Sequence, residues 1–207
     1  MANVLYVSCT PTAVDADGVC ASQSPGAGAI LINGALATGG VATFGAAQLV
    51  RLTSGGNDSG ITFTFNGTDA DGNAQSQTVA GTNISNTDTT LFFKTITSIT
   101  ASAAVAGTIL VGNLITSVSP TIYPNCGISP VNLAILAQLM SGTATFEMQQ
   151  SYGGDPGYPD TWIANATITA KSATTELAFN QPIHALRLRL TASTSGNVSL
   201  RVIQAGV

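Results

Sequence analysis

Hydrophobic and polar residues alternate along most of the chain, in short runs separated by clusters of Gly, Asn, Asp and Ser. A period of two is typical of antiparallel strands that bury one face and leave the other in water. The clearest run is 61–66, which is followed by a turn-rich loop at 67–73 and a second run at 75–79. These three segments predict a β-hairpin, and the pattern along the chain predicts an all-β fold.

The remaining runs predict the other strands. They lie at 28–33, 48–53, 91–99, 108–111, 131–140, 143–150, 162–169, 176–179, 183–191 and 198–203. Leu and Ala in 131–140 would also suit a helix, but the segment lies between Pro130 and Gly142 and among strands, so we expect a strand there. The prolines at 120–130 indicate a linker or a sheet edge, because proline is poorly tolerated in central strands.

The organisation expected from these runs is two antiparallel β-sandwich or barrel-like domains behind an extended N-terminal arm. The arm covers 1–27, with at most a short strand at 4–7, the first domain covers 28–114 and the second 115–207. Arms of this kind either remain unordered or lie on a partner. The first residues lack the basic and apolar regions of a signal peptide, and no segment is apolar enough for a membrane helix.

The last two runs are expected to pair with each other. Placing Leu190 opposite Leu200 turns the apolar residues of both strands inward and sets Arg189 opposite Arg201, with Arg187 one pleat away. Like charges directly opposite each other destabilise a sheet. This arrangement suggests a docking patch for carboxylates of a neighbouring subunit, and the alternative is that the three side chains extend into solvent.

Charge is scarce in this chain. Charged residues make up 8% of 207 residues and the net charge is −4, whereas hydrophobic residues make up 44%. Nucleic-acid binding is not expected, because it needs a concentrated basic face. The single histidine, His184, excludes a multi-histidine metal site within one chain, and we expect it to face inward as a structural residue. We therefore expect no catalytic residue, metal site or cofactor, and no enzyme.

Two further groups of residues allow more than one interpretation. Cys9, Cys20 and Cys126 lack metal-binding spacing and are expected to be free thiols, with a Cys9–Cys20 bridge as the alternative. The acidic loop that starts at Asp69 resembles the beginning of a calcium loop, but the twelfth position is Ala80 rather than Glu, which favours a hairpin turn and leaves open only an adventitious ion.

Three aromatic residues lie near each other in the sequence of the second half. Tyr152, Tyr158 and Trp162 would suit a platform on which a carbohydrate stacks, although aromatics more often cap one end of a sandwich. Together with Arg187, Arg189 and Arg201, these residues are the interface candidates.

Two groups of segments carry a family resemblance. The first group is SGGNDSGITFTFNGTDADGN at 54–73, TVAG at 78–81 and FKTITS at 93–98, and the second is GTATF at 142–146, PIHALRL at 182–188 and VIQAG at 202–206. The first group resembles a module common in virion structural proteins of tailed bacteriophages, and the second resembles a companion domain of the same proteins. The resemblance implies a virion component assembled in the host bacterial cytoplasm, with no enzymatic residues to carry over.

The resemblance also suggests partners. We expect a capsid decoration or cement protein that binds the major capsid protein or other virion proteins and copies of itself, with a trimer as the favoured cyclic form. The alternative is a neck, tail or fibre-associated protein with a receptor- or glycan-binding β module. A surface rich in Thr, Ser and Asn is compatible with both roles, because another protein can cover it without burying an unpaired charge.

Overall fold

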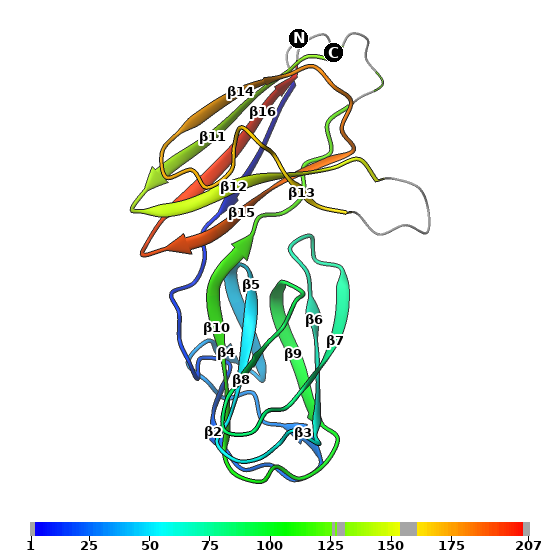
Figure 1. Ribbon diagram of the computed structural model, residues 1–207, viewed down its shortest axis with the longest axis vertical. Coiled ribbons are helices and arrows are strands. Elements are labelled where there is room, and N and C mark those ends of the chain that lie inside the picture. Colours follow the sequence, from blue (N-terminus) through cyan, green and yellow to red (C-terminus); the bar gives the residue numbers. More distant parts are fainter. Residues whose placement is uncertain (1–2, 126, 128–130, 154–160, 205–207) are drawn as a thin grey trace. The chain divides into compact units, whose positions relative to one another are not determined.

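The structure, a computed structural model, describes residues 3–125, 127, 131–153 and 161–204. The chain forms two compact units, which we call the N-terminal unit (Pro11–Ser117) and the C-terminal unit (Met1–Thr10 with Val118–Val207). Every regular element of the described residues is a β-strand, and the strand pairs are antiparallel (Figure 1), which confirms the all-β prediction.

The N-terminal unit is built on one twisted sheet whose strands run in the order β10-β5-β9-β6-β7. Short strands extend it, with β2 on β10, β3 on β9, and β4 and β8 on β5. The strands are β2 (Cys20–Gln23), β3 (Gly28–Ile30), β4 (Ala37–Thr38), β5 (Val41–Ser54), β6 (Thr62–Thr68), β7 (Ala74–Ala80), β8 (Asn86–Asp88), β9 (Phe93–Ala101) and β10 (Ile109–Val118).

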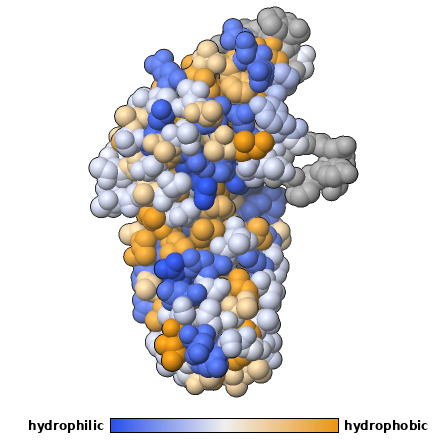
Figure 2. All heavy atoms as spheres, in the orientation of Figure 1, coloured by the Kyte–Doolittle hydropathy of each residue, from blue (hydrophilic) through white to orange (hydrophobic). Residues whose placement is uncertain are grey.

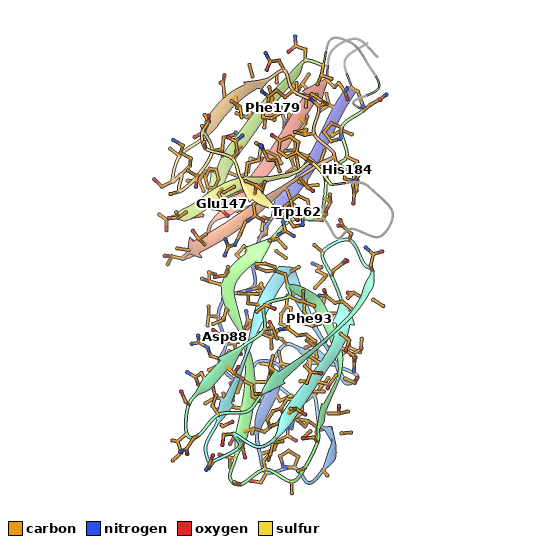
Figure 3. All side chains as sticks on the ribbon, turned by 45° about the vertical axis from the view of Figure 1, so that its right-hand side comes forward. Asp88, Phe93, Glu147, Trp162, Phe179 and His184 are labelled. Carbon is orange, nitrogen blue, oxygen red and sulfur yellow. The ribbon has the colours of Figure 1, made fainter. Side chains whose placement is uncertain are left out.

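The predicted hairpin is confirmed as β6 and β7. Phe63 and Phe65 of β6 are fully buried in the same core cluster as Phe93, while the alternate positions carry polar side chains (Figure 3 labels Phe93). Burying a side chain of this size stabilises the fold by roughly 1.5–3 kcal/mol. In the loop, the Asp69 carboxylate accepts hydrogen bonds from the backbone amides of Asp71 and Asn73, so it closes the turn.

Residues 11–19 do not form part of a separate arm. The buried amide of Gln48 accepts a hydrogen bond from the Thr12 amide at 2.8 Å and donates one to the Thr12 carbonyl at 3.0 Å. Buried Asn113 accepts a hydrogen bond from the Asp15 amide at 3.0 Å and donates one to the Ala13 carbonyl at 3.0 Å. This segment satisfies two buried amides, so it belongs to the unit.

The C-terminal unit contains two sheets. One has the order β1-β16-β11-β14 and the other the order β13-β12-β15 (Figure 1). The strands are β1 (Asn3–Cys9), β11 (Leu133–Ser141), β12 (Ala144–Ser151), β13 (Ile163–Ala164), β14 (Thr175–Phe179), β15 (Ala185–Ser193) and β16 (Asn197–Gln204). Side chains from both sheets form the core, including Ile135, Leu200, Phe146, Met148 and Leu188.

The first strand of the chain therefore lies beside one of the last. β1 pairs with β16 over its full length, from Asn3 opposite Gln204 to Cys9 opposite Val198. The prediction of a short strand at 4–7 is confirmed, but the expectation of an arm covering 1–27 is wrong. The backbone of β1 thus pairs within its own chain and covers the edge that β16 would otherwise expose.

The predicted pairing of the last two strands is also wrong. β15 pairs with β12, whereas β16 pairs with β1 and β11, so the two strands lie in opposite sheets. The inward phase was predicted correctly, because Leu190 and Leu200 are both buried. Arg189 lies opposite Glu147 rather than opposite Arg201, which removes the repulsion that the predicted hairpin would have carried.

One predicted strand is much shorter than expected. Of 162–169, only Ile163–Ala164 is a strand, because the Asn165 side chain accepts hydrogen bonds from the amides of Thr167 at 2.9 Å and Ile168 at 3.1 Å. An asparagine that bonds its own following backbone forms a turn. The strand predicted at 131–140 is confirmed as β11.

Candidate functional site

The outer face of the β12–β15 pair carries a connected polar network. Glu147 accepts a hydrogen bond from Arg189 at 3.2 Å and one from the Gln149 amide at 2.9 Å, and Gln149 accepts one from Arg187 at 2.8 Å. The register explains the network, because Glu147 lies directly opposite Arg189 and Gln149 directly opposite Arg187. We call these four residues the Arg–Glu row.

The pair at the centre of this row is partly withdrawn from water. The Glu147 side chain is 12% exposed and the Arg189 side chain 35%. Within the described part of the chain, the Nε atom of Arg189 is buried without a hydrogen-bond partner. Removing Arg189 would leave a largely buried carboxylate without its counter-charge, which is costly. Its carboxylate partner lies in the same chain, so the structure supports an intramolecular role for this arginine.

The predicted aromatic platform is only partly described. The guanidinium of Arg187 lies 4.1 Å from the centroid of the Trp162 ring, so one face of the indole is occupied by a cation. Tyr152 is exposed, and its hydroxyl accepts a hydrogen bond from Gln150 at 2.6 Å. Tyr158 lies outside the described residues. Figure 3 labels Trp162, which directly precedes β13, and Glu147, which lies on β12, the strand that pairs with β13. Carbohydrate stacking by these residues stays a prediction.

The outer face of the β1-β16-β11-β14 sheet has a different character. The register places Val4, Ile203, Ala134 and Ala178 in one row across the four strands. The next row is Tyr6, Arg201, Leu136 and Glu176. We call these eight residues the apolar face.

Large apolar side chains of this face are exposed. Val4 is 54% exposed, Tyr6 53% and Ile203 40%. Between Ile203 and Glu176 the surface is hollowed by about 390 Å³, since the alanines of β11 and β14 are short. Hydrophobic patches also lie between hydrophilic ones on the surface shown in Figure 2.

The apolar face carries two charged side chains. The Arg201 guanidinium lies 5.9 Å from the centroid of the Tyr6 ring, and Glu176 stands two strands away across Leu136. Neither Arg201 nor Glu176 forms an ion pair with any described residue of the chain. The three arginines predicted to cluster are thus divided between opposite sheets, and that prediction was wrong.

The outer face of the β6–β7 hairpin, with the part of β9 beside it, carries hydroxyl and amide side chains. Hydroxyls of β6 bond across the strands, from Thr64 to Thr78 at 2.8 Å and from Thr68 to Thr95 at 2.8 Å. Asn66 donates a hydrogen bond to Ser98 at 3.0 Å. These groups satisfy one another, so another protein surface could cover this face without isolating an ion.

The described residues that could act in catalysis or bind a metal do not gather at one site. His184 is exposed rather than inward, with its ring edge-on to Tyr123 at 5.4 Å between centroids. Ile183 takes the buried position, and the phase of the strand shifts at Ala185 and Leu186, which are both buried. Among the described residues, no three of the types His, Cys, Asp and Glu gather as metal ligands.

Cys20 is a free, buried thiol, as expected, and buried Cys9 does not form the alternative bridge to it. Cys126 lies outside the described residues. Burial raises the pKa of the Cys20 thiol to about 12, which suppresses the thiolate that nucleophilic chemistry requires. None of the described segments forms a helix with the length and apolarity needed to cross a bilayer.

Sequence reasoning missed the apolar face, although a signal was present. Residues 4–7 read Val-Leu-Tyr-Val, and 133–136 read Leu-Ala-Ile-Leu, so each strand has apolar residues on both faces. A strand that is apolar at successive positions has apolar residues on both of its faces. The second of these faces is either buried as well or exposed to solvent.

Comparisons with known proteins identify no family. No protein-family model matches the chain, and no curated protein matches it. Among solved structures, it is similar to the VP2 subviral particle of infectious bursal disease virus at 14% identity, covering 98% of this chain and 71% of that one with a TM-score of 0.24. A TM-score this low carries no argument about fold or function.

Proposed function

We propose that this chain is a non-enzymatic structural component of a virion, present in many copies and covered by neighbouring proteins. The observation that carries the proposal is the apolar face of the C-terminal unit. Exposed side chains such as Tyr6 and Ile203 lie on one sheet face, and contiguous apolar surface marks interaction sites in proteins.

The hydroxyl and amide patch over the β6–β7 hairpin of the N-terminal unit supports the same proposal. Covering an unpaired charge costs several kcal/mol, whereas hydroxyls and amides that already bond to one another are covered at little cost. The virion assignment rests on the segments that resemble phage structural proteins, within which the capsid decoration role is preferred and the neck, tail and fibre roles are alternatives. Its partners would be the major capsid protein or other virion proteins, and further copies of this chain.

The test is co-sedimentation of the purified chain with particles that lack it, together with sedimentation velocity of the chain alone. We expect binding to the particles, self-association or both. The variant Ile203→Ser should weaken these contacts, whereas Val14→Ser, which changes a 57% exposed residue of the other unit, serves as the matched control. Monomeric behaviour at every concentration together with no affinity for particles would refute the proposal.

A further inference from the structure

The two charged residues of the apolar face lie on the two strands that flank β11, one on each side. In the row Tyr6–Arg201–Leu136–Glu176, Arg201 lies one strand to one side of Leu136 and Glu176 lies one strand to the other. Neighbouring strands are about 4.8 Å apart, so the two charges stand at roughly equal distances from a line along β11. A rotation of 180° about that line brings each charge above the position of the other.

We infer that the apolar face docks on the same face of a second copy of this chain, about a two-fold axis that runs along β11. This inference deepens the proposed function and rests on it. A two-fold contact uses the same patch on both copies, so the patch must complement itself. In this arrangement Arg201 of one copy meets Glu176 of the other, and the pair occurs twice. Leu136 packs against the second copy's Leu136 on the axis.

The neighbouring row complements itself in size. The row is Val4–Ile203–Ala134–Ala178, and the same rotation places Ile203 of one copy over Ala178 of the other. Ala178 lines the hollow of about 390 Å³, which is open to receive the isoleucine. Ala134 meets the second copy's Ala134. A large side chain opposite a small one lets two sheets approach to the usual spacing of about 10 Å.

The edge of the contact has a role as well. Tyr6 lies on β1, next to Arg201 of β16. Because β16 faces β14 of the second copy, Tyr6 lies just outside the strands that face each other. Its ring therefore flanks the Arg201–Glu176 pair on the outer side. A ring of residues that excludes water strengthens a central polar contact. Arg201 is held over this ring already, so it loses less freedom when the pair forms.

The size of the face sets the strength of the contact. With the axis along β11, three strands of each copy face one another over roughly 14 Å by roughly 17 Å, or about 240 Å² per copy, which is well below the roughly 800 Å² per partner of a standard stable interface. We therefore expect association at micromolar or higher concentrations, which suits a protein held in many copies on one surface. The contact is two-fold, in contrast to the threefold arrangement favoured on sequence grounds.

The test is a reciprocal charge exchange, measured by sedimentation velocity over a wide concentration range. Arg201→Glu and Glu176→Arg should each weaken self-association by at least about 30-fold, because each places two like-charged contacts in the interface. The double variant R201E/E176R should restore association to within about 3-fold of the unchanged chain. Lys171→Glu alters the net charge by the same amount as Arg201→Glu and lies outside the apolar face, so it is the matched control.

Ala178→Trp adds an independent arm, because it fills the hollow and should abolish association. Thermal melting of each variant establishes that it is folded. Association that is unchanged in the single variants, or not restored in the double variant, overturns the two-fold contact and leaves the proposed function standing. The same holds if the chain is monomeric yet binds particles. If it neither self-associates nor binds particles, both inferences fail.

Discussion

Gln48 links a strand of the N-terminal unit to the segment that sequence analysis assigned to an arm. Its amide is fully buried and makes three hydrogen bonds, two with the Thr12 backbone and one to the Leu114 carbonyl at 2.6 Å. The substitution Gln48→Ala removes all three bonds at once. It also leaves the Thr12 amide without its Gln48 acceptor, whereas the Thr12 carbonyl keeps a hydrogen bond from the Asn113 side chain at 3.3 Å.

The expected cost follows from the bonds lost. Each net hydrogen bond contributes about 0.5–1.5 kcal/mol, so three of them predict a loss of about 3 kcal/mol in the free energy of unfolding. A domain of this kind has about 5–15 kcal/mol in all, so the variant should fold but unfold at a clearly lower urea concentration. The Thr12 amide, which donates to Gln48, should also exchange its hydrogen faster.

Equilibrium urea unfolding and hydrogen exchange measure the two effects. Gln181→Ala is the matched control, because Gln181 is exposed, and it should cost no more than about 0.5 kcal/mol. If Gln48→Ala costs no more than this control and the Thr12 amide exchanges as before, residues 11–19 are not tied to the unit as described. Deletion of 1–25 would then be a fair test of an arm; in the present structure it removes β1 and should unfold the protein.

Three further predictions concern stability. Arg189→Ala should lower the free energy of unfolding by about 1–2 kcal/mol, because it strands the mostly buried Glu147, and should leave self-association unchanged; a loss of assembly without a loss of stability would contradict this. Burial raises the pKa of Cys20 from 9.0 to about 12, so the folded state holds the thiol proton more tightly than the unfolded state. The free energy of unfolding measured in urea should therefore fall as the pH rises from 9 to 12. If Cys20→Ala shows the same decrease of this free energy with pH, the prediction is refuted. Gly67→Ala should cost about 3 kcal/mol, because its Cβ would overlap a backbone oxygen of β9, whereas a Cβ at Gly60 meets nothing and Gly60→Ala is the control in thermal melts.

Local patterns predicted local structure well. The hairpin of β6 and β7 is specified by alternation and by a loop whose first residue, Asp69, bonds the turn backbone. Strand β11 was predicted in spite of its Leu and Ala content, because the flanking Pro130 and Gly142 limit a helix. In each case the deciding residues lie within about twenty positions of one another in the sequence.

Pairing between distant strands was not predictable in the same way. β15 and β16 are adjacent in the sequence but join opposite sheets, and β1 reaches β16 from the other end of the chain. Period-two alternation fixes which face is buried but does not say which strand lies alongside. The opposition of Arg189 and Arg201 was itself a warning against the hairpin, and Glu147 was available as a better partner.

The candidate site was predicted only in part for the same reason. Arg187, Arg189 and Trp162 are indeed near one another, but they bond within their own sheet. Arg201 belongs to the opposite sheet, where its neighbour Tyr6 comes from a segment that had been assigned to an arm. A face assembled from four strands distant in sequence becomes visible only when the register is known.

The central claim is that this chain is built to be covered by its neighbours, and hydroxyl-radical footprinting tests it most directly. Oxidation of Tyr6 and Ile203 is compared between the dilute chain and the chain in its concentrated or particle-bound state, with the exposed Val14 as the internal reference. We predict strong protection of Tyr6 and Ile203 in the concentrated or bound state. Oxidation of both at the same rate in the two states would contradict the claim.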